Sequence, residues 1–156
     1  EIRILLYPEV CIAMFVCGVI DDNESVLVRG AERFSAFEDD DGFSLKFSGS
    51  YKDKSERDAD ATLKSNILLV DASKWERTTE LAEQLEVANM DRDLNKILRG
   101  FTDEADSSSP GPITTTNWGC DRRFNGARDV RPLIQWMAAS VAGRELHLWL
   151  VEDRDH

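Results

Sequence analysis

The stretch Pro112–Val130, PITTTNWGCDRRFNGARDV, decides the fold. Its first part, Ile113–Thr116, is rich in β-branched residues and predicts a short buried strand. Asn117–Cys120 then ends the strand, because Asn and Gly tolerate the backbone angles of a tight turn. A polar loop that contains a further glycine follows, and a helix begins at Val130. The stretch therefore predicts a strand, a glycine-bearing loop and a helix N-terminus in direct succession.

A continuous apolar stripe predicts that this helix runs from Val130 to Ala142. Asp129 is placed to cap its N-terminus, and Gly143 is placed to end it. The order of strand, glycine loop and helix presents backbone N–H groups and the positive end of the helix dipole to an anion, usually a phosphate. The stripe residues recur at helical spacing along one face: Val130, Leu133, Ile134, Met137, Ala138 and Val141.

The rest of the chain alternates helices and strands. With 156 residues it fits one domain, residues 1–156, with a core of its own. Strands alternating with helices predict a three-layer α/β domain. Ile2–Cys17 is predicted to be mostly helical, with Pro8 opening its main helix. A helical region of mixed face is predicted at Lys74–Met90 and a further helix at Asp91–Leu98, closed at Gly100. Strands are predicted at Ser25–Arg29, Ser44–Ser48, Asn66–Val70 and Leu146–Val151, a surface loop at Ser50–Leu63 and a flexible loop at Asp103–Gly111.

The charge of the chain narrows the kinds of partner. A net charge of -11 argues against broad, sequence-independent binding to nucleic acid. Asp121–Arg131, however, carries four arginines against two aspartates, a local excess of two positive charges. Beside a helix N-terminus this excess favours a bound phosphate group; solvated surface arginines are the alternative. No apolar run is as long as a membrane span and no signal peptide is found, so no membrane partner is predicted.

The cysteines and histidines predict no metal site. Cys11, Cys17 and Cys120 show no C-x-x-C spacing, and their odd number indicates free thiols in a reducing compartment. The two histidines, His147 and His156, lie far from any cluster of cysteines, so a structural zinc ion is not expected. Because the first residue is Glu rather than Met, we expect the chain to be a piece of a longer protein.

Five blocks in the right order make the sequence resemble the poly(ADP-ribose) glycohydrolase family. The most specific block is TTTNWGC, which a Phe/Gly loop and the segment LIQWMAASVAGR follow. The resemblance implies a macrodomain, a mixed and partly parallel sheet between helices, of which this chain is the C-terminal portion, truncated at its N-terminal side. The other blocks are EIR-x-L-x-x-PE at Glu1–Glu9, DDNE at Asp21–Glu24, GAERFSAF at Gly30–Phe37 and DLNKILRGF at Asp93–Phe101.

The resemblance assigns the catalytic acid/base to Glu1. The family's motif ends in a Glu that directly precedes Ile-Arg, and Glu1-Ile2-Arg3 matches that position. Cleaving a ribose–ribose bond requires a carboxyl that protonates the leaving oxygen and then takes a proton from the attacking water. Without the resemblance, a terminal Glu would be interpreted as a frayed helix end. The family's triple glycine precedes this position and is not in the chain, so we expect the chain alone to be weak or inactive.

The NWGC block and the loop after it resemble the family's ADP-ribose loop. By this resemblance Asn117, Gly119 and Cys120 line the ribose and diphosphate of bound ADP-ribose. The Asn117 amide either reaches a ribose hydroxyl or sets the turn. Phe124 is expected against a ribose, and Gly126 is expected close to the diphosphate. Cys120 has no partner histidine, so nucleophilic catalysis by its thiol is not expected.

Two loops depart from the family pattern. Asp121–Arg123 stands where the family has small residues, and these side chains hinder close approach of the backbone to a diphosphate. The arginines can offset this with charge-assisted contacts. On the adenine side the family has a Tyr, whereas this chain has Glu38–Gly42 and the nearest ring is Phe43, which either offers a π face to adenine or belongs to the core. Trp118 is expected to anchor its loop rather than to stack on substrate.

The first functional hypothesis is therefore a hydrolase of the O-glycosidic bonds in ADP-ribose polymer, a glycosidase without metal or organic cofactor. The resemblance implies poly(ADP-ribose), ADP-ribose and poly(ADP-ribosyl)ated proteins as partners, a role in the DNA damage response, and a place in nucleus and cytoplasm. It implies no sequence-specific nucleic acid binding. Two alternatives stay open: a diverged, non-catalytic ADP-ribose-binding module, and a structural domain whose acidic loops bind a basic protein partner.

Overall fold

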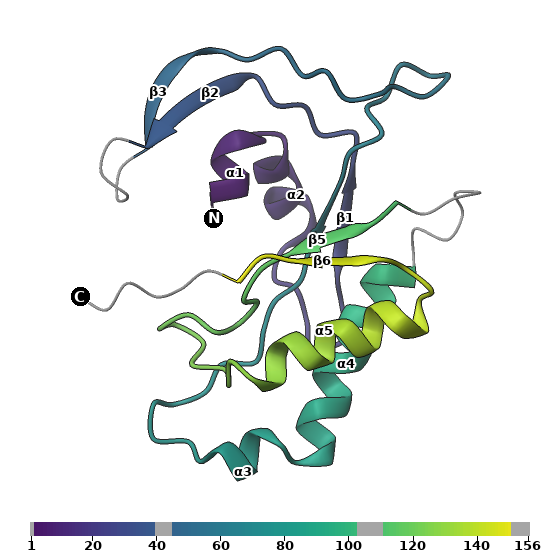
Figure 1. Ribbon diagram of the computed structural model, residues 1–156. Helices are drawn as coiled ribbons and strands as arrows, with labels where there is room; N and C mark the ends of the chain where they lie inside the picture. Colours follow the sequence, from purple (N-terminus) through teal and green to yellow (C-terminus); the bar gives the residue numbers. More distant parts are fainter. Residues whose placement is uncertain (1, 40–44, 103–110, 151–156) are drawn as a thin grey trace. The chain divides into compact units, whose positions relative to one another are not determined.

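The computed structural model describes residues 2–39, 45–102 and 111–150 (Figure 1). Over these ranges the chain forms five helices and six strands, a mixture that confirms the predicted α/β class. The chain divides into two compact units, one of Glu1–Val19 with Val26–Leu69, the other of Ile20–Ser25 with Val70–His156. The prediction that residues 1–156 are one domain stays a prediction, and the loop predicted to be flexible lies, up to residue 110, outside the described residues.

The first unit begins with two short helices, α1 (Ile2–Leu6) and α2 (Val10–Cys17). The segment Ile2–Cys17 is therefore mostly helical, as predicted, with a break at residues 7–9 just before the main helix. Pro8 explains the break, because proline has no N–H to donate to the preceding turn. Val10, the first residue of α2, is fully buried at 0% exposure and anchors the helix in this unit.

Two of the predicted strands of the first unit are confirmed to within one residue. β1 (Val26–Arg29) and β4 (Asn66–Leu69) pair antiparallel, and Val26 lies opposite Leu69. Between them, residues 51–65 have only an isolated bridge and no continuous strand, in agreement with the predicted surface loop.

A second antiparallel pair in this unit joins β2 (Ser35–Asp39) to β3 (Leu45–Ser50), the second of which was predicted near its observed place. β2 was not predicted, because its sequence SAFED contains no β-branched residue and gives little local signal. Its pairing is non-local: the rings of Phe37 and Phe47 meet edge to face across the two strands, with centroids 6.2 Å apart. Such cross-strand aromatic pairs stabilise a sheet.

The second unit contains three helices, α3 (Leu81–Gln84), α4 (Val87–Thr102) and α5 (Val130–Val141). The helix predicted at Lys74–Met90 is wrong over residues 74–80, which are not helical. The predicted end at Gly100 is also wrong, since α4 continues through this buried glycine to Thr102.

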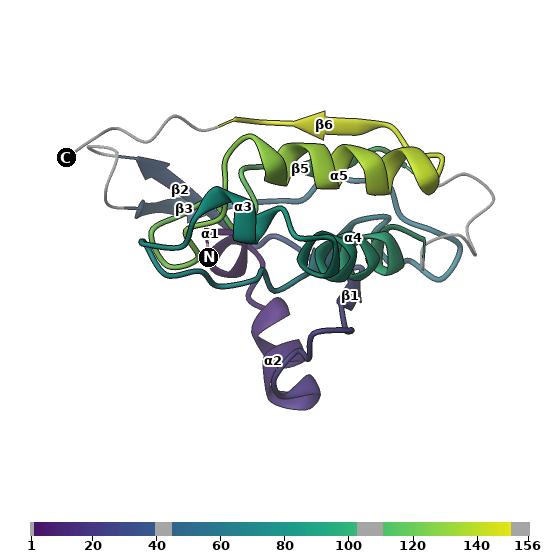
Figure 2. The same cartoon turned by 90° about the horizontal axis from the view of Figure 1, so that it is seen from below.

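Two parallel strands lie beside α5. β5 (Ile113–Thr115) lies beside β6 (Leu146–Leu148), with Ile113 opposite Leu146. Figure 2 shows α5 alongside these strands, with α4 packed against it. The predicted strand–helix–strand unit is therefore confirmed; the last residue of the predicted final strand, Val151, lies outside the described residues.

Gly143 ends α5 as predicted. Its φ of +67° is one that glycine adopts without strain. Its N–H donates to the Ser140 carbonyl at 3.2 Å, and the N–H of Arg144 donates to the Ala139 carbonyl at 2.9 Å. These two bonds are those of a Schellman motif, which satisfies the last carbonyls of a helix.

The buried face of α5 is rotated about the helix axis, by about one residue, from the apolar stripe that the sequence predicted. Leu133, Met137 and Val141 are exposed at 55%, 39% and 69%, so three predicted core positions are wrong. Arg131 and Gln135 are buried in their place because both find polar partners inside the unit. The buried residues of α5 are Val130, Arg131, Ile134, Gln135, Ala138 and Ala139.

No helix in the described part of the chain combines the length and the apolar composition that a bilayer crossing requires.

Candidate functional site

The loop after β5 opens with the predicted tight turn. The N–H of Cys120 donates to the carbonyl of Asn117 at 3.1 Å, and Gly119, the third residue of the turn, has a φ of +72°. A positive φ at this position is what a type II turn demands. A side chain on Gly119 would also bring its Cβ within 2.7 Å of the Ala72 Cβ. Backbone angle and packing therefore both require glycine here.

Trp118 anchors the loop, as the sequence predicted. Its indole N–H donates to the Val70 carbonyl at 3.0 Å, just beyond β4 in the chain. The guanidinium carbon of Arg131 lies 5.1 Å from the centre of its ring, within the range of a cation–π interaction. The ring is thus held by two groups of its own unit.

A second turn follows at Asp121, and the side chain of this residue shapes it. Its Oδ1 accepts the backbone N–H of Arg123 at 2.8 Å and of Phe124 at 3.2 Å. Its carbonyl accepts the N–H of Asn125 at 2.8 Å. The carboxylate is therefore occupied in shaping the turn, a use that Asp makes of its short side chain. This Asp at the start of a turn was the sequence signal for it.

The two glycines of the loop lie against each other. The N–H of Gly126 donates to the Gly119 carbonyl at 2.9 Å. A Cβ on Gly126 would lie 2.5 Å from that carbonyl oxygen and 2.6 Å from the Nε of Arg131. Glycine is therefore needed here for the close approach of the two halves of the loop, whatever else the residue contacts.

A second segment, residues 74–84, forms a wall beside the loop. The N–H of Trp75 donates to the Phe124 carbonyl at 2.8 Å, and the side-chain amide of Asn125 donates to the Trp75 carbonyl at 2.9 Å. Gln84, at the end of α3, donates to the Asn125 carbonyl at 3.3 Å and accepts from the Ala127 N–H at 2.8 Å. Four hydrogen bonds therefore fix the wall to the loop.

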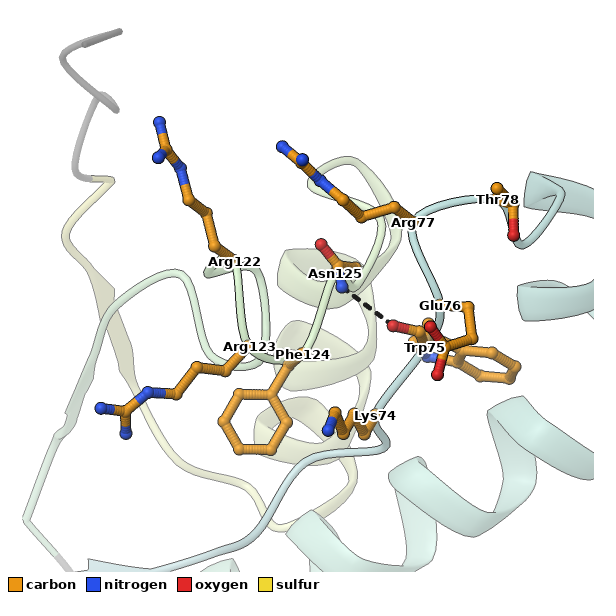
Figure 3. A pocket seen from close by; sticks show the side chains of 9 residues that line it. All are labelled: Lys74, Trp75, Glu76, Arg77, Thr78, Arg122, Arg123, Phe124 and Asn125. Atoms are coloured by element: carbon orange, nitrogen blue, oxygen red, sulfur yellow. Dashed lines mark hydrogen bonds between the residues drawn. The ribbon is translucent and has the colours of Figure 1, made fainter.

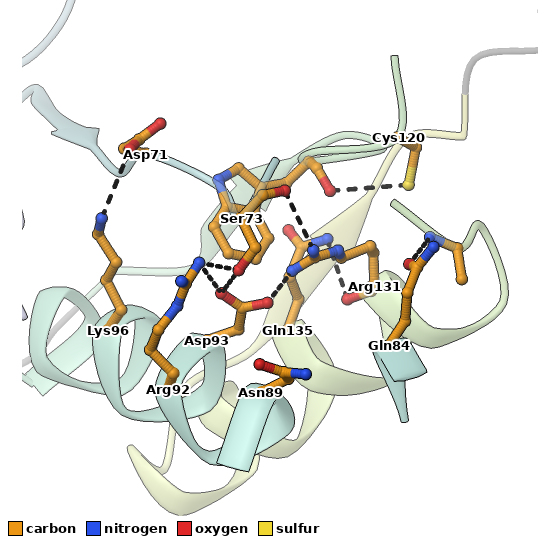
Figure 4. A network of polar contacts seen from close by, with 12 residues as sticks. Asp71, Ser73, Gln84, Asn89, Arg92, Asp93, Lys96, Cys120, Arg131 and Gln135 are labelled. Atoms are coloured by element: carbon orange, nitrogen blue, oxygen red, sulfur yellow. Dashed lines mark hydrogen bonds and ion pairs between the residues drawn. The ribbon is translucent and has the colours of Figure 1, made fainter. Parts of the chain in front are cut away.

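A buried ion pair supports the loop from below (Figure 4). Asp93 on α4 and Arg131 on α5 are each 2% exposed, and the Arg131 Nη1 donates to an Asp93 oxygen. The other Asp93 oxygen accepts from the Ser73 hydroxyl and lies 3.5 Å from the Arg92 guanidinium. Arg131 also faces Gly119 and Gly126, so this pair sets the floor of the loop.

Two further polar side chains are buried next to this pair. Gln135 accepts from the Thr115 hydroxyl at 2.7 Å and donates to the Thr116 carbonyl at 3.2 Å, which fixes the end of β5 to α5. Lys96 is 2% exposed, and its Nζ lies 3.8 Å from a carboxylate oxygen of Asp71. Each of these groups has the partner that a buried polar side chain requires.

An open pocket of about 600 Å³ lies between the wall and the loop (Figure 3). It is lined by residues 74–78 of the wall and residues 122–125 of the loop. Four lining side chains are cationic and one is anionic, a formal excess of three positive charges in a chain of net charge -11. The ring of Phe124 is half-buried on the loop side. The volume is within the range of small-molecule sites, about 300–1,000 Å³.

The N-terminus of α5 offers fewer donors than the sequence predicted. The N–H groups of Val130 and Arg131 both donate to the Ala127 carbonyl at 3.1 Å, and Pro132 has no N–H. Asp129 has helical backbone angles and makes no side-chain capping bond, so its predicted role as cap is wrong. An anion at this end would meet the helix dipole but none of the first three N–H groups.

Cys120 is a buried thiol. Burial raises its pKa above the ordinary value of 9.0, and the positive charges of Arg131 and Arg128 oppose that rise. A thiol with a raised pKa is a poor nucleophile at neutral pH. Within the part of the chain that the structure describes, no group of three or more His, Cys, Asp or Glu residues could hold a metal ion.

The structure brings together five of the residues that the sequence selected for substrate binding. They share one loop, in which Asn117 is half-buried and Cys120 is buried. Glu1 and Phe43 lie outside the described residues, so their roles stay predictions. The five residues in the loop are Asn117, Gly119, Cys120, Phe124 and Gly126.

Three residues that shape the site were missed in the sequence. Trp75 and Gln84 were assigned to a helical region of mixed face, and no local pattern distinguished them. Asp93 left a clearer signal: it lies four residues before Ile97 and therefore on the same buried face of α4. A carboxylate on an apolar helix face indicates a buried partner. Here the partner is Arg131, which the sequence analysis had counted in the local basic island expected to favour a phosphate group.

A parallel strand–helix–strand unit with a glycine loop at the carboxyl end of its first strand is the arrangement by which α/β proteins hold nucleotides. The comparisons with known proteins name the family. Residues 1–156 match the model of the family described as "Poly (ADP-ribose) glycohydrolase (PARG), Macro domain fold". The chain therefore belongs to the poly(ADP-ribose) glycohydrolase family, as its motifs predicted.

Curated relatives agree with this match. Poly(ADP-ribose) glycohydrolase 1 of Caenorhabditis elegans is 32% identical over 158 residues, which cover 94% of this chain and 20% of the relative. Poly(ADP-ribose) glycohydrolase 2 of the same animal is 28% identical over 165 residues, 99% of this chain and 33% of the relative. A probable poly(ADP-ribose) glycohydrolase 2 of Arabidopsis thaliana is 26% identical over 181 residues, 92% of this chain and 34% of the relative. The chain thus spans a third or less of the length of the two animal relatives.

Proposed function

We propose that the protein containing this chain hydrolyses the ribose–ribose O-glycosidic bonds of ADP-ribose polymer and releases ADP-ribose. The observation that carries the proposal is the family match over all 156 residues. The loop after β5 supports it, because two turns, two close-packed glycines and four bonds to the wall fix its backbone before any ligand arrives. A loop fixed in advance loses little entropy on binding.

Within this proposal the loop contacts the ribose and diphosphate through Asn117, Phe124 and Gly126. Glu1 acts as the general acid that protonates the leaving oxygen, and its carboxylate then takes a proton from the attacking water. Phe43 offers its ring to adenine. The substrate is the polymer on poly(ADP-ribosyl)ated proteins, and the protein works in nucleus and cytoplasm without a cofactor.

Turnover of labelled polymer by the full-length protein tests the catalytic part of the proposal. We expect Glu1→Gln to lower the turnover rate by about 100- to 10,000-fold, the usual contribution of a general acid. Glu86→Gln is the matched control, because Glu86 is an exposed glutamate of the second unit. Equal loss in both variants, or no loss in Glu1→Gln, would show that the catalytic group lies elsewhere.

A second candidate is a non-catalytic ADP-ribose-binding module. The observation that favours it is the turn at Asp121, whose carboxylate is bonded to the loop backbone where the family has small residues. A full-length protein that binds ADP-ribose in calorimetry but does not cleave the polymer, with its upstream glycines intact, would support this candidate. Turnover at a rate that depends on Glu1 would exclude it.

A further inference from the structure

We propose that Gln84 is a positioning residue for ADP-ribose binding. Its side-chain amide holds the backbone on both sides of Gly126 and so keeps the loop after β5 in the conformation that receives ADP-ribose. Gln84 is the last residue of α3 and acts through the loop rather than by touching the bound molecule. The inference rests on the proposed function, because the shape of the loop matters only if the loop binds ADP-ribose.

The amide of Gln84 bonds to the loop through both of its polar atoms. Its N–H group donates to the Asn125 carbonyl at 3.3 Å, and its oxygen accepts the Ala127 N–H at 2.8 Å. These groups belong to the two peptide units that flank Gly126. The N–H of Gly126 itself donates to the Gly119 carbonyl at 2.9 Å. A single side chain of the wall therefore fixes the orientation of both peptide units around the glycine.

Asn125 is the residue at which the loop needs this support. Its φ is +52°, in the left-handed region that residues other than glycine adopt at a cost. Its side chain is held as well, because its amide donates to the Trp75 carbonyl at 2.9 Å (Figure 3). A residue in this region persists where the surrounding structure over-determines it, and such residues cluster at ligand-binding sites. Gln84 holds the main chain of Asn125, and Trp75 holds its side chain.

The floor of the loop does not depend on Gln84. A Cβ on Gly126 would lie 2.6 Å from the Nε of Arg131, a buried group that is paired with Asp93. Gln84 is uncharged and half-buried, as are the two residues to which it bonds, so water can reach the groups that its removal leaves open. Loss of the amide should therefore loosen the loop while the second unit stays folded.

The effect on affinity follows from the fraction of molecules in which the loop keeps its shape. A molecule that binds one conformation binds more weakly in proportion as that conformation is less populated. Loss of two hydrogen bonds of ordinary net strength lowers the population about tenfold. We therefore expect the Kd of ADP-ribose to rise about tenfold when both bonds of Gln84 are removed.

Calorimetric titration of the full-length protein with ADP-ribose tests this expectation. Gln84→Met removes both polar atoms and keeps the length of the side chain. Glu83→Met is the matched control, because Glu83 is the exposed neighbour on the same helix. We expect a Kd about ten times that of the wild type in Gln84→Met and an unchanged Kd in the control.

Two variants of Asn125 test the backbone conformation itself. Asn125→Gly and Asn125→Ala both lose the side-chain bond to Trp75, but only glycine adopts a φ of +52° without strain. We expect the glycine variant to bind ADP-ribose more tightly than the alanine variant. Equal Kd values in the two would show that the wall does not act by holding this residue in the left-handed region.

Turnover of labelled polymer separates positioning from stability. A variant that is partly unfolded has fewer active molecules, which lowers the apparent kcat and leaves KM unchanged. A displaced binding loop raises KM instead, because it weakens interactions that substrate and transition state share. We expect Gln84→Met to raise KM about tenfold and to keep kcat within about twofold. A fall in kcat at unchanged KM would assign Gln84 a purely structural role and overturn the proposal.

The calorimetric outcomes distinguish this inference from the proposed function. A wild type that binds no ADP-ribose would refute the proposed function, and the role of Gln84 with it. A wild type that binds ADP-ribose with the same Kd as Gln84→Met would refute the role of Gln84 alone. An equal loss of affinity in Glu83→Met would assign the effect to α3 as a whole, and would also overturn the inference.

Discussion

Asp93→Asn should destabilise the second unit more than any other conservative change on α4. The substitution keeps the size of the side chain but removes the negative charge that faces Arg131. Both residues are 2% exposed, so the guanidinium stays buried without its counter-ion. Breaking one partner of a buried ion pair typically costs about 3–5 kcal/mol.

The expected cost lies near the lower end of that range, because Arg131 keeps two weaker partners. Its Nη2 lies 3.5 Å from the Ser73 carbonyl, and the ring of Trp118 lies 5.1 Å from its guanidinium carbon. We therefore expect a loss of about 3 kcal/mol, a large part of the 5–15 kcal/mol by which domains are usually stable. For a chain of this size the corresponding fall in Tm is roughly 6–12 °C.

Urea unfolding followed by tryptophan fluorescence measures the loss of unfolding free energy in the second unit. All four tryptophans, at positions 75, 118, 136 and 149, belong to the second unit, so the signal reports on that unit alone. Asp91→Asn is the control, since Asp91 is exposed on the same helix and should change the free energy of unfolding by less than about 0.5 kcal/mol.

A paired replacement separates the cost of an orphaned charge from the value of the pair itself. Asp93→Leu combined with Arg131→Met removes both charges, and we expect it to be clearly more stable than Asp93→Asn, because a well-packed apolar pair often replaces a buried ion pair without loss. The reasoning would be refuted if Asp93→Asn lost less than about 1 kcal/mol, well below the usual cost of breaking such a pair.

Three further predictions concern the loop and its thiol. Gly126→Ala should lower the free energy of unfolding by about 1–3 kcal/mol through overpacking against the Gly119 carbonyl; unchanged urea midpoints would contradict the 2.5 Å separation that the added Cβ would have. Trp118→Phe should cost about 1–3 kcal/mol, because the carbonyl just after β4 loses its donor; thermal unfolding measures this, and a gain in stability would exclude the anchoring role. Iodoacetamide at neutral pH should label exposed Cys17 well before buried Cys120, whose raised pKa keeps its thiol protonated until the pH rises beyond the ordinary thiol value of 9.0; faster labelling of Cys120, read by mass spectrometry of peptides, would contradict this.

Local sequence signals predicted the strand–helix–strand unit correctly. The β-branched residues predicted β5, and the repeat of apolar residues predicted α5. Gly143 predicted the end of α5. Each of these signals depends only on residues that are close together in the sequence. The tight turn at residues 117–120 belongs to the same group, because its glycine is required by the angle that it adopts.

Local sequence signals could not predict which face of α5 is buried. The apolar repeat alone predicts that Leu133 and Met137 are buried and that Arg131 and Gln135 are exposed. The partner that reverses this prediction, Asp93, lies 38 residues away in the sequence. Contacts at such distances are a property of the packed unit rather than of the helix, so hydropathy alone places the wrong residues inside.

The wall of the candidate site was hidden for a related reason. Residues 74–80 were predicted to be helical, and they are held by a loop 50 positions further along the chain, where the Asn125 side-chain amide donates to the Trp75 carbonyl. The catalytic assignment of Glu1 depended wholly on family resemblance, because nothing in the surrounding residues indicates it. The residues of the loop after β5 were therefore easier to predict than the wall that the loop contacts.

The hydrogen bonds between wall and loop decide which substitutions the pocket can accept without a change of shape. Trp75, Phe124 and Ala127 take part through main-chain atoms alone, and only the amides of Gln84 and Asn125 contribute side chains. Substitutions at the cationic positions therefore leave the shape of the pocket intact. A protein engineer could reverse its charge and select a different ligand without rebuilding the loop, and mutation and selection could have done the same.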